Sequence, residues 1–253
     1  MATLFVSDLH LSADRPEKLA LFEQFCDRAL AVAEAVYILG DLFEIWIGDD
    51  DDDADHRAIV SSLRRLTTGN VQVYVAHGNR DFLFGPRFER DTGARLLEDY
   101  AVIDLYGTRT LLMHGDLLCT RDVKYQRFRR VVRNPILRTL FLSTPLAWRK
   151  RIAKRTQSET QASMAKKSQD IMDVEPGTVH RAMRQHRVEL LIHGHTHRPC
   201  VHDVSLDGCE AQRIVLGDWY DQDDVLICDS AQRRSLRVSE FVRAADAVAA
   251  GIN

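Results

Sequence analysis

The feature that most constrains the fold of this chain is an alternation of β-rich and helical segments over its first eighty residues. Residues 4–8, 35–41 and 71–79 are β-rich runs that each end in a polar residue. Helical patterns separate these runs: one has Pro16 near its start, and a shorter one spans 58–66. Because this order is βαβαβ, it predicts a mainly parallel sheet with right-handed crossovers. Ligands are then expected at the carboxyl ends of its strands.

The rest of the chain predicts a second sheet and a helical insertion. We expect an α/β core formed by residues 1–120 and 187–253. Residues 121–186, where the pattern is almost wholly helical, are expected to form an insertion that caps this core. Further strands with hairpin-like spacing, which suggest a second sheet packed on the first, are expected at residues 101–106, 110–114, 188–193, 213–216, 225–228 and 235–239.

The composition narrows the class of protein. With 253 residues, 45% hydrophobic and 28% charged, the chain resembles an ordinary soluble α/β domain. Its five cysteines are scattered without a C-x-x-C pair, which is typical of reduced thiols. Only a short apolar run precedes Asp8, and nowhere do about eighteen apolar residues follow one another. We therefore expect no signal peptide, no membrane-spanning helix and a cytoplasmic location.

Clusters of polar residues follow five of the predicted strands. In IHGHTHRP, His193, His195 and His197 occupy every second position directly after an apolar run. A polar turn is a poor explanation for three histidines at the mouth of a buried strand, where neutral imidazoles are ready metal ligands. The five clusters are DLH with Asp8 and His10, GDLFE with Asp41, GNRD with Asn79 and Arg80, MHGD with His114, and HGHTH with His195 and His197.

In this order and spacing, the clusters resemble the signature of the calcineurin-like metallophosphoesterase superfamily, which is D-x-H, G-D, G-N-[HR], H and G-H-x-H. The resemblance implies the fold of that superfamily, in which two packed mixed β-sheets are flanked by helices in an αββα sandwich. It also implies a site for two divalent metal ions. In that site Asp8, His10 and His197 would hold the first ion, Asn79, His114 and His195 the second, and Asp41 would bridge both.

This implied ligand set indicates a metal and a chemistry. Mixed oxygen and nitrogen ligands suit Mn²⁺, our first choice, or another first-row dication. Two dications with the carboxylates of Asp8 and Asp41 leave a charge of about +2, which favours an anionic phosphate, and ions roughly 3.5 to 4 Å apart share and acidify a water. Hydrolysis of a phosphate ester or anhydride is therefore expected. His193 is expected at the strand end, beside the ligands rather than among them.

Longer stretches are similar to the UDP-2,3-diacylglucosamine diphosphatases of lipid A biosynthesis: GDLFEIWIGDD, GNRDFL, HGDLLCTRD followed by YQ, KSQDIMDV and HGHTHRP. Leu117 and Arg121 depart from the commoner HGDTLCTDD. The similarity implies water attack on the α-phosphorus of UDP-2,3-diacylglucosamine, giving UMP and 2,3-diacylglucosamine 1-phosphate. The implied catalytic residues are Asp41, Asn79, Arg80, His114 and His195, and the implied substrate contacts are Asn79, Arg80, Asp122, Thr160, Met164, Lys167 and His195.

The insertion has an unusual charge. Residues 121–167 contain fourteen Lys or Arg against two acids, so this stretch carries +12 and the remainder −15 of the net charge of −3. Apolar residues such as Leu140 and Phe141 alternate there with basic ones such as Arg149. An ordinary helical cap with a buried inner face explains part of the pattern. The pattern also fits acyl-chain capture and peripheral docking to the anionic cytoplasmic face of the inner membrane, at about 1 kcal/mol per Lys or Arg.

Two other functions stay open. A nuclease or phosphoprotein phosphatase of the same superfamily would use the same metal ligands, and the basic insertion would suit nucleic acid. The many aliphatic residues of the insertion favour the lipid substrate instead, so we expect no nucleic-acid partner and no obligate protein partner. A non-catalytic scaffold with this fold should have lost metal ligands, whereas all seven are present.

The remaining polar residues have simpler interpretations. The five aspartates at 49–53 are expected to form a solvated, mutually repelling face. Asp116 and Asp218 follow glycines near the same strand ends and are candidates for orienting ligands. The isolated histidines, which are expected to be structural or surface residues, are His56, His77, His180, His186 and His202.

Overall fold

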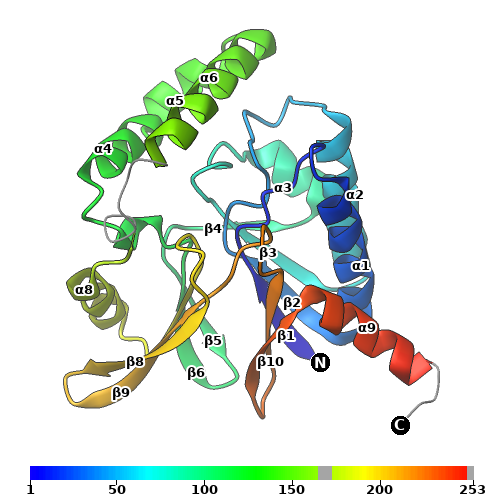
Figure 1. The fold of residues 1–253 in the computed structure, drawn as a ribbon, viewed down its shortest axis with the longest axis vertical. Coiled ribbons are helices and arrows are strands. Elements are labelled where there is room, and N and C mark those ends of the chain that lie inside the picture. The colour runs from blue at the N-terminus through cyan, green and yellow to red at the C-terminus, as the bar shows by residue number, and fades with distance from the viewer. Residues whose placement is uncertain (165–172, 250–253) are drawn as a thin grey trace.

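The structure is a computed structural model that describes residues 1–164 and 173–249, with side chains described in 1–156 and 173–243. Two β-sheets pack face to face, and helices cover their outer faces (Figure 1). This arrangement confirms the predicted α/β fold of two mixed sheets flanked by helices.

The first sheet contains the strands that the βαβαβ alternation predicts. Its first four strands in chain order are parallel to one another, and the last two are antiparallel additions at one edge. In spatial order the strands are β11 (Arg233–Arg237), β10 (Asp224–Cys228), β1 (Ala2–Val6), β2 (Ala33–Ile38), β3 (Gln72–Ala76) and β4 (Arg95–Leu97).

The second sheet is built around three parallel strands with an antiparallel strand at each edge. In spatial order it consists of β5 (Ala101–Leu105), β6 (Thr108–Leu112), β7 (Leu190–His193), β9 (Cys209–Val215) and β8 (Cys200–Leu206).

Alternating side chains along each strand divide the core into layers. Along β1, Leu4 and Val6 pack outward with the helices, whereas Phe5 packs between the sheets. Leu112 and Ile192 of the second sheet belong to the same inter-sheet cluster as Phe5. The helices associated with the first sheet are α1 (Pro16–Val32), α2 (Ala54–Thr68), α3 (Pro86–Thr92) and α9 (Val238–Ala249), and α8 (Pro176–His186) packs on the second.

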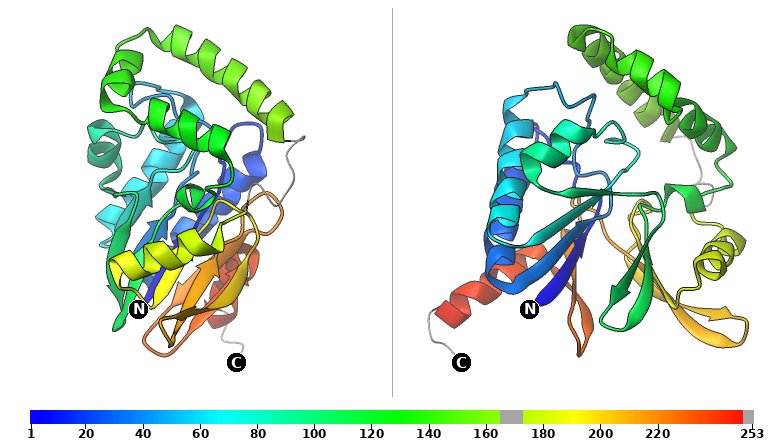
Figure 2. Two further views of the ribbon diagram at one scale, coloured as in Figure 1. Left: turned by 90° about the vertical axis from the view of Figure 1, so that its left-hand side faces the viewer. Right: turned by 180° about the vertical axis from the view of Figure 1, so that it is seen from behind.

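Three further helices lie together at the end of the molecule opposite the two chain termini, as the views of Figures 1 and 2 agree. They are α4 (Val123–Val132), α5 (Pro135–Leu142) and α6 (Leu146–Met164). The side chains of Asp122 and Asn134 accept backbone N–H groups at the starts of α4 and α5. We refer to α4, α5 and α6 as the cap. The boundaries of the insertion at 121 and 186 stay a prediction.

Four elements escaped sequence analysis, and the bounds of one strand were wrong. The missed elements are β4, β8, α3 and α9. β4 has only three residues, and β8 is an edge strand in which only Val204 and Leu206 are buried, so neither gives a strong periodic signal. The strand expected at 235–239 ends at Arg237, because Val238 begins α9 and is fully buried against the first sheet.

Candidate metal centre

The carboxyl ends of the parallel strands bring the predicted ligands together. Loops after β1, β2 and β3 carry Asp8, His10, Asp41 and Asn79, and loops after β6 and β7 carry the remaining three histidines. Two groups have ligand atoms that lie within 4.8 Å of one another: Asp8, His10 and His197, and Asp8, Asp41 and His114.

Direct contacts join these groups into one cluster. Asn79 Oδ1 lies 3.0 Å from both His114 Nε2 and His195 Nδ1, and the two histidine nitrogens are 3.1 Å apart. Asp41 Oδ2 lies 3.8 Å from His10 Nε2 and 3.9 Å from His114 Nε2. Asp41 therefore stands between the two sets of histidines, where a bridging carboxylate would be needed.

The residues present fit a pair of divalent cations. Both ring nitrogens of His10 are buried, and neither has a hydrogen-bond partner in the described part of the chain. Burial lowers the pKa of His10 to about 3, so the imidazole is neutral and can offer a nitrogen lone pair to a metal ion. Burial, with Asp81 and Asp8 nearby and His114 opposing, raises the pKa of Asp41 to about 7. A cation would relieve this crowding of buried carboxylates and use the unpartnered imidazole nitrogens.

Left-handed backbone conformations are concentrated at the cluster. The φ angles are 55° at Asp8, 48° at His10, 52° at Asp41, 68° at His195 and 54° at His197. For non-glycine residues this region costs on the order of 1–3 kcal/mol each, and such strain persists where the surroundings enforce it. The chain thus turns sharply after three different strands, which aims these side chains at one point.

Gly194 permits the close approach of the HGHTH turn to β1. A Cβ atom at this position would lie 2.0 Å from Ser7 Oγ and 2.2 Å from Asp8 Oδ2. The backbone N–H of His195 donates to Asp8 Oδ2 at 2.8 Å. Any larger residue at position 194 would push this turn away from Asp8.

Of the two carboxylates that the sequence offers for orienting ligands, Asp218 contacts a histidine of the cluster and Asp116 does not. Asp218 Oδ2 lies 3.1 Å from His197 Nδ1, so Asp218 contacts a predicted ligand. Asp116 instead binds the Tyr125 hydroxyl at 2.6 Å and Arg129 Nε at 2.7 Å. A carboxylate on one ring nitrogen fixes the tautomer and leaves the other nitrogen for a metal.

Two acidic residues at the site escaped sequence analysis. Glu44 Oε2 lies 3.4 Å from His10 Nδ1, and its Oε1 lies 3.2 Å from Arg80 Nη1. The buried carboxylate of Asp81 accepts the backbone N–H groups of Gly78 and Leu42, and so ties together the loops after β2 and β3. Glu44 is the last residue of the GDLFE motif and Asp81 the last residue of GNRD. Their place in these motifs was the only sequence feature that could have pointed to a role at the site.

His193 lies beside the cluster, as expected. Its side chain is fully buried, with Nδ1 2.8 Å from the Gly194 carbonyl oxygen and Nε2 3.2 Å from Arg213 Nη1. Burial, and then the nearby Arg213, lowers its pKa to about 3. Nδ1 therefore carries the proton donated to Gly194, and Nε2 accepts from Arg213.

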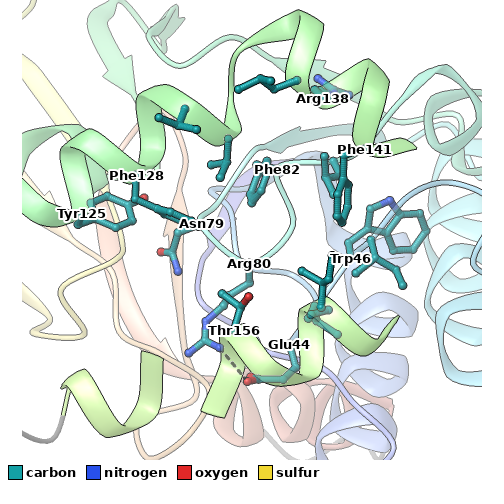
Figure 3. Close-up of a pocket in the computed structure, with 18 of the residues that line it drawn as sticks. Glu44, Trp46, Asn79, Arg80, Phe82, Tyr125, Phe128, Arg138, Phe141 and Thr156 are labelled. Carbon is teal, nitrogen blue, oxygen red and sulfur yellow. Dashed lines mark hydrogen bonds and ion pairs between the residues drawn. The ribbon is translucent and has the colours of Figure 1, made fainter. Parts of the chain in front are cut away.

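An apolar pocket of about 640 Å³ lies between the core loops and the cap (Figure 3). Asn79 and Arg80, which belong to the loop after β3, line the pocket together with aromatic side chains of the core loops and of the cap. Figure 3 shows Arg80 meeting Glu44 at the edge of the pocket, near Thr156 of α6. The aromatic residues of the lining are Trp46, Phe82, Tyr125, Phe128 and Phe141.

The other predicted substrate contacts are placed less directly. Asp122 is buried at the start of α4, where its Oδ1 accepts the Tyr125 backbone N–H at 3.1 Å. Thr160 and Met164 belong to α6, but their side chains lie outside the described ones. Lys167 lies outside the described residues.

The solvated, mutually repelling face expected at residues 49–53 is only partly right: Asp50, Asp52 and Asp53 are exposed, but the carboxylates have partners. Asp49 accepts the backbone N–H groups of Arg87 and Phe88 in the first turn of α3, and Asp53 caps α2. Asp50 and Asp51 form ion pairs with basic residues of α6. Asp52 pairs with Arg87 of α3 at 2.9 Å. Mutual repulsion is therefore offset by a partner for each of the five carboxylates.

Several bases of the cap point inward. Arg133 pairs with Asp99 at 2.9 Å and donates to the Gly78 carbonyl oxygen, and Arg138 donates to the Phe84 carbonyl oxygen. These two arginines, with Arg149 and Lys150, neutralise or bind core groups. They are engaged with the core rather than presented to an external partner, so the charge of +12 overstates the basic surface.

The chain matches known proteins over most of its length. Residues 1–199 match the calcineurin-like phosphoesterase family. The chain is 51% identical over 234 residues to the UDP-2,3-diacylglucosamine hydrolase of Aeromonas salmonicida (strain A449), covering 92% of each protein. It is also 51% identical over 234 residues to the protein of that name from Pseudomonas aeruginosa (strain UCBPP-PA14), covering 92% of this chain and 98% of the other.

None of the helices within residues 1–164 and 173–249 combines the length and the apolar character that a membrane span requires.

Proposed function

Because the chain belongs to the calcineurin-like phosphoesterase family, we propose that it is a metal-dependent hydrolase of UDP-2,3-diacylglucosamine. Its products would be UMP and 2,3-diacylglucosamine 1-phosphate. The relatives named as hydrolases of this compound support the substrate. The observation that carries the proposal is the junction of two unlike sites: the cluster of ligand-type side chains adjoins a large apolar pocket through Asn79 and Arg80.

Two divalent ions, with Mn²⁺ as the first choice, would be held by the seven side chains of the cluster. Asp8, His10 and His197 would hold one ion, and Asn79, His114 and His195 the other, with Asp41 shared. When bound, such ions supply positive charge for phosphate oxygens and acidify a water. The contacts of Asp41 with histidines of both sets support its shared role.

Arg80 would bind the pyrophosphate at the junction between the cluster and the pocket. Its guanidinium stays charged at any ordinary pH, so it cannot donate a proton to a leaving group. A sugar 1-phosphate does not need a proton from the protein, because its second pKa is about 6 and it leaves as an anion. Arg80 and Asn79 would instead hold the oxygens on which charge develops, while water attacks the α-phosphorus.

The acyl chains would enter the apolar pocket. Each buried methylene contributes about 0.8 kcal/mol, so a pocket lined by Phe82, Phe128 and Phe141 strongly favours a diacylated substrate over a soluble diester. Asp122, Thr160, Met164 and Lys167 remain proposed substrate contacts.

The outer side of the cap would rest on the anionic cytoplasmic face of the inner membrane. Ile136 is 69% exposed and Leu140 59%, one helical turn apart on α5. Arg127 and Arg130 of α4, the preceding helix of the cap, are exposed as well. Exposed apolar side chains next to basic ones are typical of helices that lie at a membrane surface.

The direct test incubates the purified protein with Mn²⁺ and UDP-2,3-diacylglucosamine and measures UMP. We expect UMP to form and EDTA to stop its formation. Absence of UMP with either Mn²⁺ or Mg²⁺ would contradict the proposal. Cleavage of nucleic acid or of simple diesters without UMP release would favour a nuclease instead.

A further inference from the structure

The cap is attached to the core in an unusual way. Among the described side chains of α4, α5 and α6, the two buried ones are Arg129 and Arg149, and α5 buries none. Phe141 and Leu142, at the end of α5, are half-buried and pack against the core of the first sheet, whereas Ile136 and Leu140 of the same helix are exposed. Charged and polar contacts therefore contribute much of the attachment of the cap over the pocket, beside a small apolar contact at the end of α5.

Arg149 forms the buried contact between α6 and the core. Its side chain is 1% exposed. Nη1 donates to the Ile47 carbonyl oxygen at 2.7 Å and to Asp50 Oδ1 at 2.8 Å, Nη2 donates to Asp50 Oδ2, and Nε donates to the Thr144 carbonyl oxygen at 3.1 Å. One side chain thus joins α6 and the end of α5 to the core loop after β2, with the planar geometry that only a guanidinium provides.

The core loop is shaped to receive this guanidinium. Gly48 has a φ of +137°, and a Cβ atom there would lie 2.3 Å from Arg149 Nη1. The Asp50 carboxylate, 56% exposed, supplies the opposite charge. Asp49, between these two residues, accepts three backbone N–H groups at the start of α3 and fixes the loop to the core.

The same loop and the same helix form adjoining parts of the pocket wall. Trp46 and Ile47 line it from the core, and Ile152, Ala153 and Thr156 line it from α6. The Ile47 carbonyl oxygen that Arg149 binds belongs to a lining residue, and Ile152 follows Arg149 by three positions on the helix. The relative position of these parts therefore depends on the contact of Arg149 with residues 47–50.

We infer that Arg149 is a positioning residue for the acyl-chain pocket, which sets substrate selectivity without touching the reacting groups. This inference rests on the proposed function. It differs from the role of Arg129, which binds Asp116 at 2.7 Å and so also affects the surroundings of His114 and His195. Arg149 has no contact with the metal centre among its described hydrogen bonds, so its loss should change the pocket alone.

The test compares Arg149→Met with Arg151→Met, which removes an exposed guanidinium two residues along the same helix. The quantity measured is kcat/KM for UDP-2,3-diacylglucosamine divided by kcat/KM for bis(4-nitrophenyl) phosphate, which has no acyl chains. We expect this ratio to fall at least about tenfold in Arg149→Met, mainly through KM, because small misplacements of a binding wall are costly. Arg151→Met should keep the wild-type ratio.

A second variant covers the case in which Arg149→Met does not fold. Asp50→Asn removes the ion pair at an exposed carboxylate and keeps the donations of Arg149 to Ile47 and Thr144. Its ratio should fall in the same direction by a smaller factor. An unchanged ratio in the folded variants, or an equal loss on both substrates, would overturn the inference.

Failure of the proposed function can be recognised separately. If the wild-type protein releases no UMP, the proposed function fails, and the pocket is then tested by the binding of a fluorescent fatty acid. Weaker binding by Arg149→Met than by Arg151→Met supports the positioning role without reference to turnover. Equal binding by the two variants would overturn it.

Discussion

The metal centre and the cap pocket are neighbours built in opposite ways. The centre consists of short loops after buried strands, with left-handed backbone at Asp8, His10 and Asp41. The outer wall of the pocket consists of the cap helices, whose only buried described side chains are Arg129 and Arg149. Rigid strand ends fix the chemistry, whereas an attached element determines which substrate reaches it. The two regions should therefore respond differently to mutation.

The largest effect is expected from removal of Asp41, the shared ligand of the centre. We predict that Asp41→Ala lowers kcat on every substrate by about 10³-fold or more, because both ions would lose a ligand. Circular dichroism should show the wild-type fold, and the bound metal should decrease. Full activity with undiminished metal content would contradict the role of Asp41. It would also contradict the claim that the strand-end loops fix the chemistry.

Arg80 stands where the two regions meet, so its loss should affect kcat rather than lipid affinity. We predict that Arg80→Ala lowers kcat by about 10²-fold, as removal of a charge-stabilising donor does. Arg80→His should fail to restore pyrophosphate cleavage at neutral pH, because the leaving sugar phosphate needs no acid. Steady-state kinetics of both variants test this, and full activity of Arg80→His would disprove the role of the guanidinium.

Asp218 supports the centre from outside through His197. We predict that Asp218→Asn lowers the affinity for Mn²⁺ by about 10- to 100-fold, as for other carboxylates that orient a ligand histidine. The matched control is Asp223→Asn, which alters a carboxylate in the same loop that pairs with Lys18. Titration of activity against free Mn²⁺ measures the effect, and equal midpoints for the two variants would argue against orientation of His197.

The smallest effect is expected from substitutions that distinguish the pocket face of α5 from its exposed face. Phe141 lines the pocket, whereas its neighbour Leu140 is 59% exposed and does not. We predict that Phe141→Ala raises KM for the diacylated substrate about tenfold, with a much smaller change on a soluble diester. Leu140→Ala should affect KM less in detergent and reduce binding to anionic vesicles instead. Equal losses on both substrates for Phe141→Ala would mean that the ring only holds the fold.

The centre was largely predictable from sequence because its residues follow the strands directly. Each β-rich run ends in a polar residue, and parallel strands place those residues at one edge, so the order of elements predicts that they lie close together. The roles of His10 and Asn79 as metal ligands came from the resemblance to the metallophosphoesterase signature. Glu44 and Asp81 were not recognised, because a single carboxylate beside a motif has no period or spacing that indicates its partner.

The cap was less predictable, because its contacts join residues far apart in the chain. Asp50 and Arg149 are separated by 99 positions in the sequence. Without knowledge of their contact, the aspartate run is read as an unpaired solvated loop and the arginine as part of a basic surface. Alternation of apolar and basic residues also does not reveal that Phe141 faces the pocket while Leu140 faces out. Local pattern predicts helices here but not which of their charges are buried.

The most direct measurement of the central claim follows the attacking oxygen. Hydrolysis of UDP-2,3-diacylglucosamine in ¹⁸O-labelled water, analysed by mass spectrometry of both products, reports which phosphorus the water attacks. If the centre attacks the α-phosphorus while Arg80 and the pocket hold the departing lipid phosphate, the label appears in UMP. Label in 2,3-diacylglucosamine 1-phosphate would contradict this arrangement of the two regions.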